Sequence, residues 1–322
     1  MLSLILFNIL LILIILLIIF ILYCYFIKRI SVLSYLVYLF FKFFGSLKTI
    51  EKNKKAIKKE ETNNEIKIPK LNNPHFCIND YNHPILKIGG RKAEKVNKDT
   101  IIIYLHGGGY TAKPLPFHYT FCDKLVSKFN YIVYMPLCPR APKYSYKEVF
   151  NYLDEVYNEL SKEYEHIILA GDSAGGGMAQ ALCQYINEKE YKQVDKLILI
   201  APWLDVSMSD YEDIDLLEKT DPRFSVLGMR YHGQFYSKGD DNYFVNPLHH
   251  GKIHNLPKTL LLVSNTELLY KQSVLLKKEY DKNNLDMKII DYKNMFHCFP
   301  LAYPYLYESR KAFKEIVEFI EE

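Results

Sequence analysis

The residues best suited to chemistry lie in the run GDSAGGG at positions 171–177, between the apolar segment 167–170 and a segment of helical character. A serine on a sharp turn from strand to helix takes backbone angles that L-residues avoid, and flanking glycines permit close backbone approach. The hydroxyl of Ser173 is thereby presented as a nucleophile, and the N–H of Ala174 is placed to donate to an oxyanion. Glycine-rich turns before helices also cradle phosphates, so this run alone leaves phosphate binding open.

A second glycine-rich run, HGGGY at 106–110, follows the β-branched apolar segment 100–105. A loop of this kind at the carboxyl end of a buried strand directs backbone N–H groups at a site, and Gly107 and Gly108 are the expected further oxyanion donors. Gly109 and His106 are expected to support the loop. A histidine inside such a loop shapes the turn by hydrogen bonding more often than it serves as the base.

Serine is a poor nucleophile at neutral pH, so acyl transfer needs an imidazole to accept its proton and a carboxylate to orient that imidazole. Glu267 follows the apolar segment 259–264, and His297 follows the segment 286–292. The chain order Ser173, Glu267, His297 is that of the α/β-hydrolases. Asp291 is the rival carboxylate, but it lies within a predicted strand and close in sequence to the base. Asp172 is expected to order the oxyanion loop through hydrogen bonds.

The elements that must position these residues alternate between strand and helix from about residue 74 onward. Strands are predicted at 76–78, 85–89, 100–105, 131–135, 167–170, 196–200, 259–264 and 286–292, and helices at 147–164, 268–282 and 308–320. This alternation predicts an α/β fold with a mostly parallel central sheet flanked by helices, which places its sites at the carboxyl ends of the strands.

The segment 206–255 interrupts the alternation without a strong strand and is predicted to be a helical cap over the site. Its histidines lack the spacing and the carboxylate partners of a metal site, so they are interpreted as surface or lid residues. They are His232, His249, His250 and His254. We therefore expect a catalytic domain at 74–322 with a cap insertion at about 206–255, and no metal.

The first residues are unlike the rest. Residues 1–27 contain no charged side chain, and as a helix they would cover about 40 Å, enough to cross a hydrocarbon core of about 30 Å. The run is too long for the apolar part of a signal peptide, lacks a basic start and is not followed by a small-residue cleavage site, so an uncleaved single-pass anchor is predicted. Residues 28–73 then form an interfacial segment and a basic linker. The apolar part, 30–47, either lies in the membrane interface, which we favour, or packs on the catalytic domain as part of a lid.

The tract 48–70 carries eight lysines against four glutamates, so its excess of +4 equals the net charge of the whole chain. The remaining residues balance, which argues against a nucleic-acid-binding face on the folded domain. The tract is interpreted as a solvated linker with weak attraction to anionic lipids. Six scattered cysteines and the absence of any Asn-x-Ser/Thr sequon leave the side of the membrane open, whereas Lys28 and Arg29 beyond the anchor favour a cytosolic domain.

Together, HGGGY, GDSAGGG, PWLD at 202–205, Glu267 and MFHCF at 295–299 make the chain, from about residue 75 to its end, resemble the hormone-sensitive-lipase-like family of α/β-hydrolase esterases. The anchor and basic linker look like those of the arylacetamide deacetylases and fungal steryl acetyl hydrolases. That resemblance implies hydrolysis of short-acyl or acetyl esters of hydrophobic alcohols, with no metal or organic cofactor. It also implies a cap formed by the N-terminal region and 206–255, and a lumenal domain at the endoplasmic reticulum, against the charge rule.

The same resemblance leaves two alternatives open. The plant gibberellin receptors resemble this family and keep its fold without the base, so a ligand-binding receptor or scaffold is one alternative, although His297 is retained here. An amidase or peptidase with the same three residues is the other. The family's DYRLAP is LCPRAP at 137–142 in this chain, and such departures bear on the substrate class.

Overall fold

One central β-sheet organises the protein. The computed structural model describes residues 2–63, 65–89, 99–209 and 211–322, and among them eight strands form a sheet in the order β1-β2-β4-β3-β5-β6-β7-β8. From β4 to β8 all neighbouring strands are parallel, while β1 and β2 add an antiparallel edge. The strands are β1 (His75–Ile78), β2 (Ile85–Ile88), β3 (Thr100–Leu105), β4 (Ile132–Pro136), β5 (His166–Asp172), β6 (Lys196–Ile200), β7 (Lys258–Ser264) and β8 (Met287–Tyr292).

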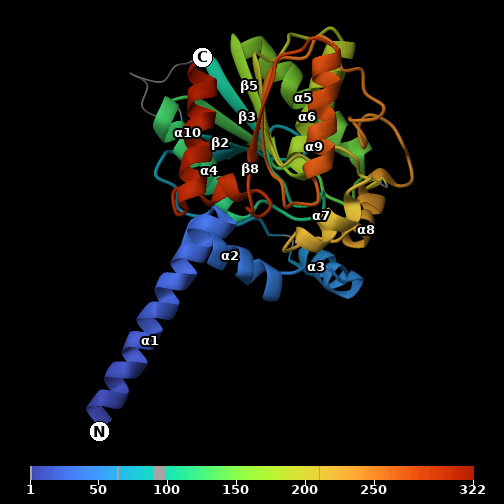
Figure 1. The fold of residues 1–322 in the computed structure, drawn as a ribbon. Helices are drawn as coiled ribbons and strands as arrows, with labels where there is room; N and C mark the ends of the chain where they lie inside the picture. The colour runs from blue at the N-terminus through green and yellow to red at the C-terminus, as the bar shows by residue number, and fades with distance from the viewer. Residues whose placement is uncertain (1, 64, 90–98, 210) are drawn as a thin grey trace.

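Helices cover both faces of the sheet, as the continuous apolar strands require. In β3, Ile101 and Ile103 belong to one buried cluster and Ile102 and Tyr104 to the other, so successive side chains fill opposite layers. Helices α4 and α10 lie on one face and α5, α6 and α9 on the other (Figure 1). Their bounds are α4 (Pro116–Phe129), α5 (Tyr146–Glu163), α6 (Ala174–Glu188), α9 (Tyr270–Lys282) and α10 (Tyr307–Glu321), with a short 3-10 turn η2 (Phe299–Ala302).

The N-terminal segment begins with an apolar helix that stands away from the folded domain (Figure 1). Helix α1 (Leu2–Leu22) continues into a π-helical turn η1 (Tyr23–Lys28). Within this part, Ile5–Lys28 is long and apolar enough to cross a membrane, and its most apolar stretch is not buried against the rest of the described chain. Length and composition suit a membrane span, although a signal sequence would satisfy the same criteria.

Two further helices bring the N-terminal segment back onto the catalytic domain. In α2 (Val32–Phe43), the Ser34 hydroxyl donates to the buried carboxylate of Glu308 in α10, and the ring of Phe41 packs on Phe296 with centroids 5.2 Å apart. Helix α3 (Ile50–Thr62) buries Asn53 and Ile57. The expectation of a solvated linker at 48–70 is therefore corrected over α3, because this amphipathic helix docks on the domain.

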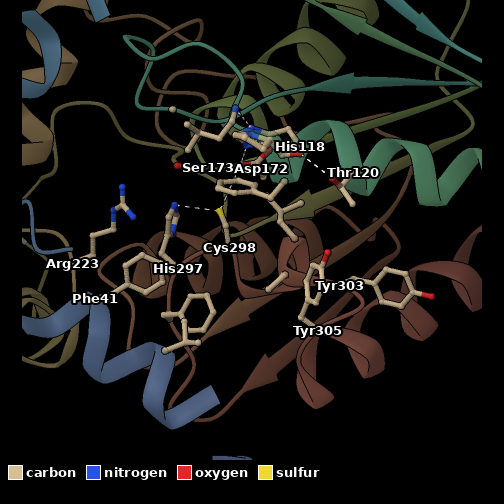
Figure 2. A pocket seen from close by; sticks show the side chains of 18 of the residues that line it. Phe41, His118, Thr120, Asp172, Ser173, Arg223, His297, Cys298, Tyr303 and Tyr305 are labelled. Atoms are coloured by element: carbon tan, nitrogen blue, oxygen red, sulfur yellow. Dashed lines mark hydrogen bonds and ion pairs between the residues drawn. The ribbon is translucent and has the colours of Figure 1, made fainter. Parts of the chain in front are cut away.

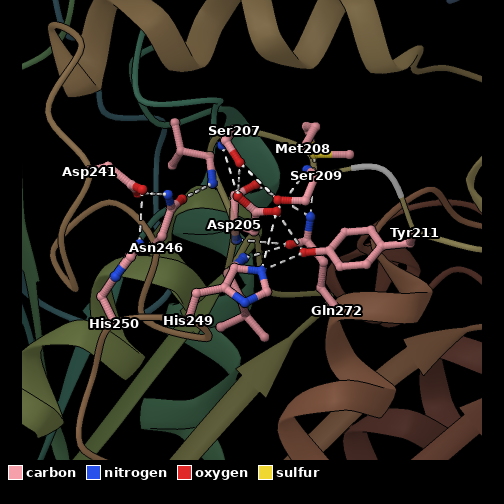
Figure 3. Close-up of polar contacts among 12 residues, drawn as sticks. Asp205, Ser207, Met208, Ser209, Tyr211, Asp241, Asn246, His249, His250 and Gln272 are labelled. Carbon is pink, nitrogen blue, oxygen red and sulfur yellow. Dashed lines mark hydrogen bonds and ion pairs between the residues drawn. The ribbon is translucent and has the colours of Figure 1, made fainter.

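The segment 206–255 forms two helices, α7 (Ile214–Thr220) and α8 (Val226–Ser237), and no strand among its described residues. Its start is fixed by the buried carboxylate of Asp205, which accepts hydrogen bonds from Ser207, from the amide of Ser209 at 2.8 Å and from the Tyr211 hydroxyl at 2.6 Å (Figure 3). Burial would raise the pKa of Asp205, but these hydrogen bonds outweigh it and lower the pKa. A fully satisfied buried carboxylate thus anchors the root of the insertion.

Candidate active site

Ser173 occupies a strained turn between β5 and α6. Its φ is +51°, in a region that L-residues seldom adopt, and only 7% of its surface is exposed. The neighbouring glycines are required sterically: an added Cβ would lie 2.4 Å from Gly175 O at Gly171 and 2.0 Å from Leu105 O at Gly175. The run GDSAG therefore allows the elbow to press against β3 while turning sharply.

The imidazole of His297 lies beside the carboxylate of Glu267. Nδ1 of His297 is 2.6 Å from Oε2 of Glu267, and the exposed fractions of the two side chains are 8% and 1%. The second carboxylate oxygen accepts from the amide of Ser264 at 2.6 Å, which fixes its orientation. Because a carboxylate can only accept, Nδ1 carries the proton and Nε2 is left as the acceptor.

Asp291, the rival carboxylate, is directed elsewhere. Its Oδ2 accepts a hydrogen bond from Tyr270 at 3.1 Å, and burial raises its pKa. Of the two candidate carboxylates, Glu267 contacts His297, whereas Asp291 contacts Tyr270. The geometry thus favours Glu267 as the group that orients the imidazole.

Ser173 and His297 line the same cavity, which has a volume of about 550 Å³. The side chains come from loops that follow β5 and β8, and Glu267 follows β7, so the carboxyl edge of the sheet gathers them. Figure 2 shows the imidazole of His297 directed toward the elbow that carries Ser173. Gly108 and Gly109 also line this cavity.

Asp172 organises the oxyanion loop from beneath. Its Oδ1 accepts from the Tyr104 hydroxyl at 2.7 Å and from the amide of Gly107 at 3.0 Å, and its Oδ2 lies 3.2 Å from Nε2 of His118. Burial would raise the pKa of Asp172, but His118 and the donated hydrogen bonds lower it. The supporting contact expected of Asp172 is thus present.

These contacts change the assignment of the oxyanion donors. The expectation for Gly107 is corrected because its N–H is already donated to Asp172 inside the protein. Gly108, with φ of +127°, and Gly109, with φ of +61°, follow in a conformation that favours glycine and brings both to the cavity wall. We therefore keep Gly108 and Ala174 as candidate donors and add Gly109 in place of Gly107.

His106 is buried under the loop. Its Nδ1 is 2.7 Å from the carbonyl of Gly107, and burial lowers its pKa to about 4. Its side chain faces His118, with ring centroids 5.8 Å apart. This is the loop-shaping position that the sequence predicts for His106.

Several residues of the site carry no motif and were missed by sequence reasoning. Cys298 places Sγ 3.3 Å from Nε2 of His297, and its position directly after the histidine is the only signal in the sequence. Val37 and Phe41 of α2 also line the cavity. In sequence they lie more than 100 residues before Ser173, Glu267 and His297. Arg223 lines it from the cap. Their roles depend on how distant segments pack, which residue spacing does not specify.

The cap histidines take the structural places expected of them. His232 lies between Thr111, at 2.8 Å, and Asn53, at 3.0 Å, and burial lowers its pKa to about 4. His249 and His250 lie near Asp205 and Asp241 on the cap surface (Figure 3). No cluster of three potential metal ligands occurs among the described residues.

Comparison with known proteins agrees with this fold. A family model for the alpha/beta hydrolase fold matches residues 102–301, most of the chain. The chain therefore belongs to the α/β-hydrolase family, and it is a hormone-sensitive-lipase-like member with esterase-type hydrolase chemistry.

Curated relatives and solved structures support that statement. An esterase of Acinetobacter venetianus is 24% identical over 73% of this chain and 80% of its own length, and the esterase LipU of Mycobacterium tuberculosis is 27% identical over 69% and 77%. The crystal structure of a candidate esterase from Staphylococcus aureus superposes with a TM-score of 0.79 at 26% identity, covering 88% of this chain and 99% of that chain.

Proposed function

We propose that the protein is a membrane-anchored serine esterase in which Ser173, His297 and Glu267 act together. The observation that carries the proposal is the 2.6 Å contact between His297 and the buried Glu267, with His297 lining the same cavity as Ser173 on its strained elbow. An imidazole held in this tautomer on the same cavity wall as a serine hydroxyl is suited to acyl transfer.

In the first half of the proposed reaction, Nε2 of His297 takes the proton of Ser173 Oγ as that oxygen attacks the ester carbonyl. Glu267 stabilises the imidazolium that results. The amides of Gly108, Gly109 and Ala174 donate to the oxyanion, where preorganised donors are worth several kcal/mol, on the order of 3 each. The imidazolium then protonates the leaving alkoxide, the alcohol departs and Ser173 is left acylated.

In the second half, water replaces the alcohol. His297 takes a proton from the water, the resulting hydroxide attacks the acyl carbonyl, and Ser173 recovers its proton as the carboxylic acid leaves. In the structure Cys298 lies beside Nε2, and burial raises the pKa of its thiol well above the ordinary value. The thiol therefore stays neutral and does not compete with Ser173 as a thiolate at neutral pH.

The proposed substrates are esters with short acyl groups on a hydrophobic alcohol. Most of the cavity wall is apolar or aromatic, including Phe41, Phe117, Phe296, Leu301 and Tyr303. An apolar wall favours an apolar substituent by about 25 cal/mol per Å² that leaves water. The name of one relative, an acetyl-hydrolase of Streptomyces hygroscopicus that is 24% identical, is compatible with a short acyl group.

For the membrane, we propose that residues 1–27 form a single-pass anchor, that 28–73 connect it to the surface of the domain, and that 74–322 form the catalytic unit with its cap at about 206–255. The uncharged, unburied helix supports the anchor. Residence in the endoplasmic reticulum stays a prediction that rests on the resemblance, and the side of the membrane stays open between the charge rule and that resemblance.

The test is hydrolysis of short-chain 4-nitrophenyl esters by the detergent-solubilised chain and by its Ser173→Ala variant. We expect steady turnover by the natural chain and a loss of at least 1,000-fold in kcat for the variant, on the order seen when such a nucleophile is removed. Equal activity in the two proteins would overturn the proposal. A folded protein without turnover would favour the receptor reading, and turnover of anilides in preference to esters would favour an amidase.

A further inference from the structure

Among the described residues, one cation that lines the apolar cavity has no ionic partner. Two of its lining residues are formally charged, Asp172 and Arg223. The carboxylate of Asp172 is satisfied by Tyr104, Gly107 and His118. Arg223 has no such set of partners, so its charge is the unexplained feature of the site.

The guanidinium of Arg223 contacts two aromatic rings. Its central carbon lies 5.2 Å from the ring centroid of Phe41 in α2 and 5.4 Å from that of Phe224. Its Nε is enclosed and has no hydrogen-bond partner within the described chain. Cation–π contact with two rings holds the guanidinium at the cavity wall and leaves its N–H groups to hydrogen bond elsewhere.

The nearest acidic residue does not neutralise this cation by direct contact. Asp221 lies on the same loop, but its carboxylate accepts from the amides of Arg223 at 2.7 Å, Phe224 at 2.8 Å and Leu268 at 2.8 Å. No ion pair joins Arg223 to a carboxylate in the part of the chain that the structure describes. Burial lowers the pKa of Arg223, yet arginine stays charged at neutral pH.

The cation is also close to the reacting groups. The ring of Phe224, which stacks on Arg223, meets the imidazole of His297 edge-on with centroids 5.1 Å apart. The same aromatic ring therefore contacts both the guanidinium and the proposed base. Figure 2 shows Arg223 beside His297 and above Phe41 at this wall.

The backbone of Arg223 is fixed from both sides. Its amide donates to Asp221, and its carbonyl accepts from the amide of Leu47 at 2.7 Å, in the segment between α2 and α3. The side chain is thus presented to the cavity from a held loop. A cation kept in an apolar wall loses hydration, and that cost is offset only when an anion or other hydrogen-bond acceptor meets it.

We propose that Arg223 binds an oxyanion, a carboxylate or a phosphate, carried by the ester substrate. The preferred substrates are then amphiphilic esters, in which an apolar part fills the cavity and an anionic group lies a few bonds from the scissile carbonyl. Planar arginine donors pair with carboxylate and phosphate in forked geometry, which makes them selective as well as attractive. This inference deepens the proposed function and rests on it.

The experiment compares esters that differ only in the anionic group. On the acyl side, 4-nitrophenyl hexanoate is compared with the mono-4-nitrophenyl ester of adipate. On the alcohol side, the butyrate ester of methyl 4-hydroxybenzoate is compared with those of 4-hydroxybenzoate and of 4-hydroxyphenyl phosphate, which separates carboxylate from phosphate. The measured quantity is the ratio of kcat/KM for anionic over neutral ester in one preparation, so a partly misfolded variant does not distort it.

We expect the natural chain to favour at least one anionic ester over its neutral counterpart. In Arg223→Met that ratio falls at least tenfold, mainly through KM, and in Arg223→Lys it falls less because the charge remains. Arg230→Met, which removes the same charge from an exposed position of α8, leaves the ratio as in the natural chain. A ratio in Arg223→Met within twofold of the natural one, or no preference for any anionic ester, would overturn the inference and leave the proposed esterase intact.

A binding measurement keeps the inference testable if no ester is hydrolysed, an outcome that would count against the proposed function itself. Calorimetric titration of the Ser173→Ala chain with octanoate and with 1-octanol is expected to show tighter binding of octanoate. Adding Arg223→Met should weaken the binding of octanoate at least tenfold and the binding of 1-octanol much less. Equal weakening of both probes, with a lower Tm, would show that Arg223 only packs the cap against α2.

Discussion

At the scale of single residues, one contact determines the tautomer of the His297 imidazole. Glu267 holds the proton of His297 on Nδ1, and only then can Nε2 accept from Ser173. We expect Glu267→Gln to lower kcat by about 100-fold to 10,000-fold, because the amide favours the wrong tautomer or leaves the imidazolium unstabilised. The measurement is steady-state hydrolysis of a 4-nitrophenyl ester.

The matched control is Asp291→Asn. Its carboxylate contacts Tyr270 and not the imidazole, so kcat should stay within about twofold of the natural value, as for an exposed substitution away from the site. If Asp291→Asn abolished activity while Glu267→Gln preserved it, the assignment of the acid would be reversed.

Cys298 gives a second residue-scale prediction. Its thiol lies 3.3 Å from Nε2 of His297, and burial raises its pKa well above the ordinary value near 9. The reactive thiolate is therefore scarce at neutral pH and increases with pH beyond 9. We expect alkylation of Cys298 by iodoacetamide, followed by mass spectrometry, to keep accelerating from pH 7 to pH 10 instead of levelling near pH 9, and to abolish esterase activity as it proceeds. A rate that is already maximal at pH 8 would contradict this.

The candidate residues that the sequence could predict are those whose role follows from chain order and local turn chemistry. Ser173 needs a glycine-flanked elbow, and Glu267 and His297 each follow a recognisable apolar strand segment. Gly107 was assigned wrongly because the direction of an amide inside a loop depends on which acceptor lies beneath it, here Asp172. Arg223 could not be predicted as a site residue, because its place in the cavity wall depends on contact with Phe41, from a helix far away in the sequence.

At the scale of elements, the strands were the most predictable parts. The segments 100–105 and 196–200 coincide with β3 and β6, because continuous β-branched and apolar runs have few other stable uses in an alternating chain. Helix α4, in contrast, has no counterpart among the sequence predictions. Polar residues interrupt its apolar pattern. Two of them, His118 and Asp123, are buried with partners that lie elsewhere in the chain, at Asp172 and at residues 72–73.

Helix α3 joins the cap to the oxyanion loop through His232. The ring bridges Asn53 of α3 and Thr111 beyond the loop, and burial holds its pKa at about 4. Since the folded pKa lies below the unfolded value near 6.5, the stabilising contribution is complete above pH 6.5 and is lost as the pH falls toward 4. At pH 5 this loss is roughly 1–2 kcal/mol.

We therefore expect urea unfolding of the detergent-solubilised chain to show a lower midpoint at pH 5 than at pH 7.5, and His232→Gln to reduce that difference. Glutamine keeps an amide near Asn53 and Thr111 but does not titrate. The control is His254→Gln, at an exposed position. Its unfolding midpoint should fall between pH 7.5 and pH 5 by as much as that of the natural chain. An identical pH dependence in His232→Gln would contradict the assignment.

At the scale of the whole molecule, the anchor, α2 and the cavity form one continuous apolar region. Helix α2 contributes Val37 and Phe41 to the cavity wall, while Leu33, Leu36, Phe40 and Phe43 are exposed at helical spacing on its outer side. Figure 1 shows α1 leaving the domain next to α2. Both readings of residues 30–47 thus apply in part: the helix packs on the domain, and its outer side stays a predicted membrane contact.

The corresponding prediction concerns vesicle binding without the anchor. A chain that starts at residue 28 should still co-float with phosphatidylcholine vesicles, because two exposed aromatic side chains of α2, Phe40 and Phe43, insert at the interface. Phe40→Ser with Phe43→Ser should reduce co-flotation at least tenfold, whereas Phe76→Ser on the edge strand β1 should not. If the shortened chain does not co-float with vesicles even without these substitutions, the prediction is contradicted and only residues 1–27 bind the membrane.

The most direct test of the central claim is labelling of the folded, detergent-solubilised chain with a serine-reactive fluorophosphonate, followed by mass spectrometric location of the adduct. The account predicts one adduct per chain, at Ser173, with the rate reduced by orders of magnitude in His297→Ala because Nε2 no longer takes the proton. Rapid labelling at another serine, or equal labelling of Ser173 with and without His297, would contradict it.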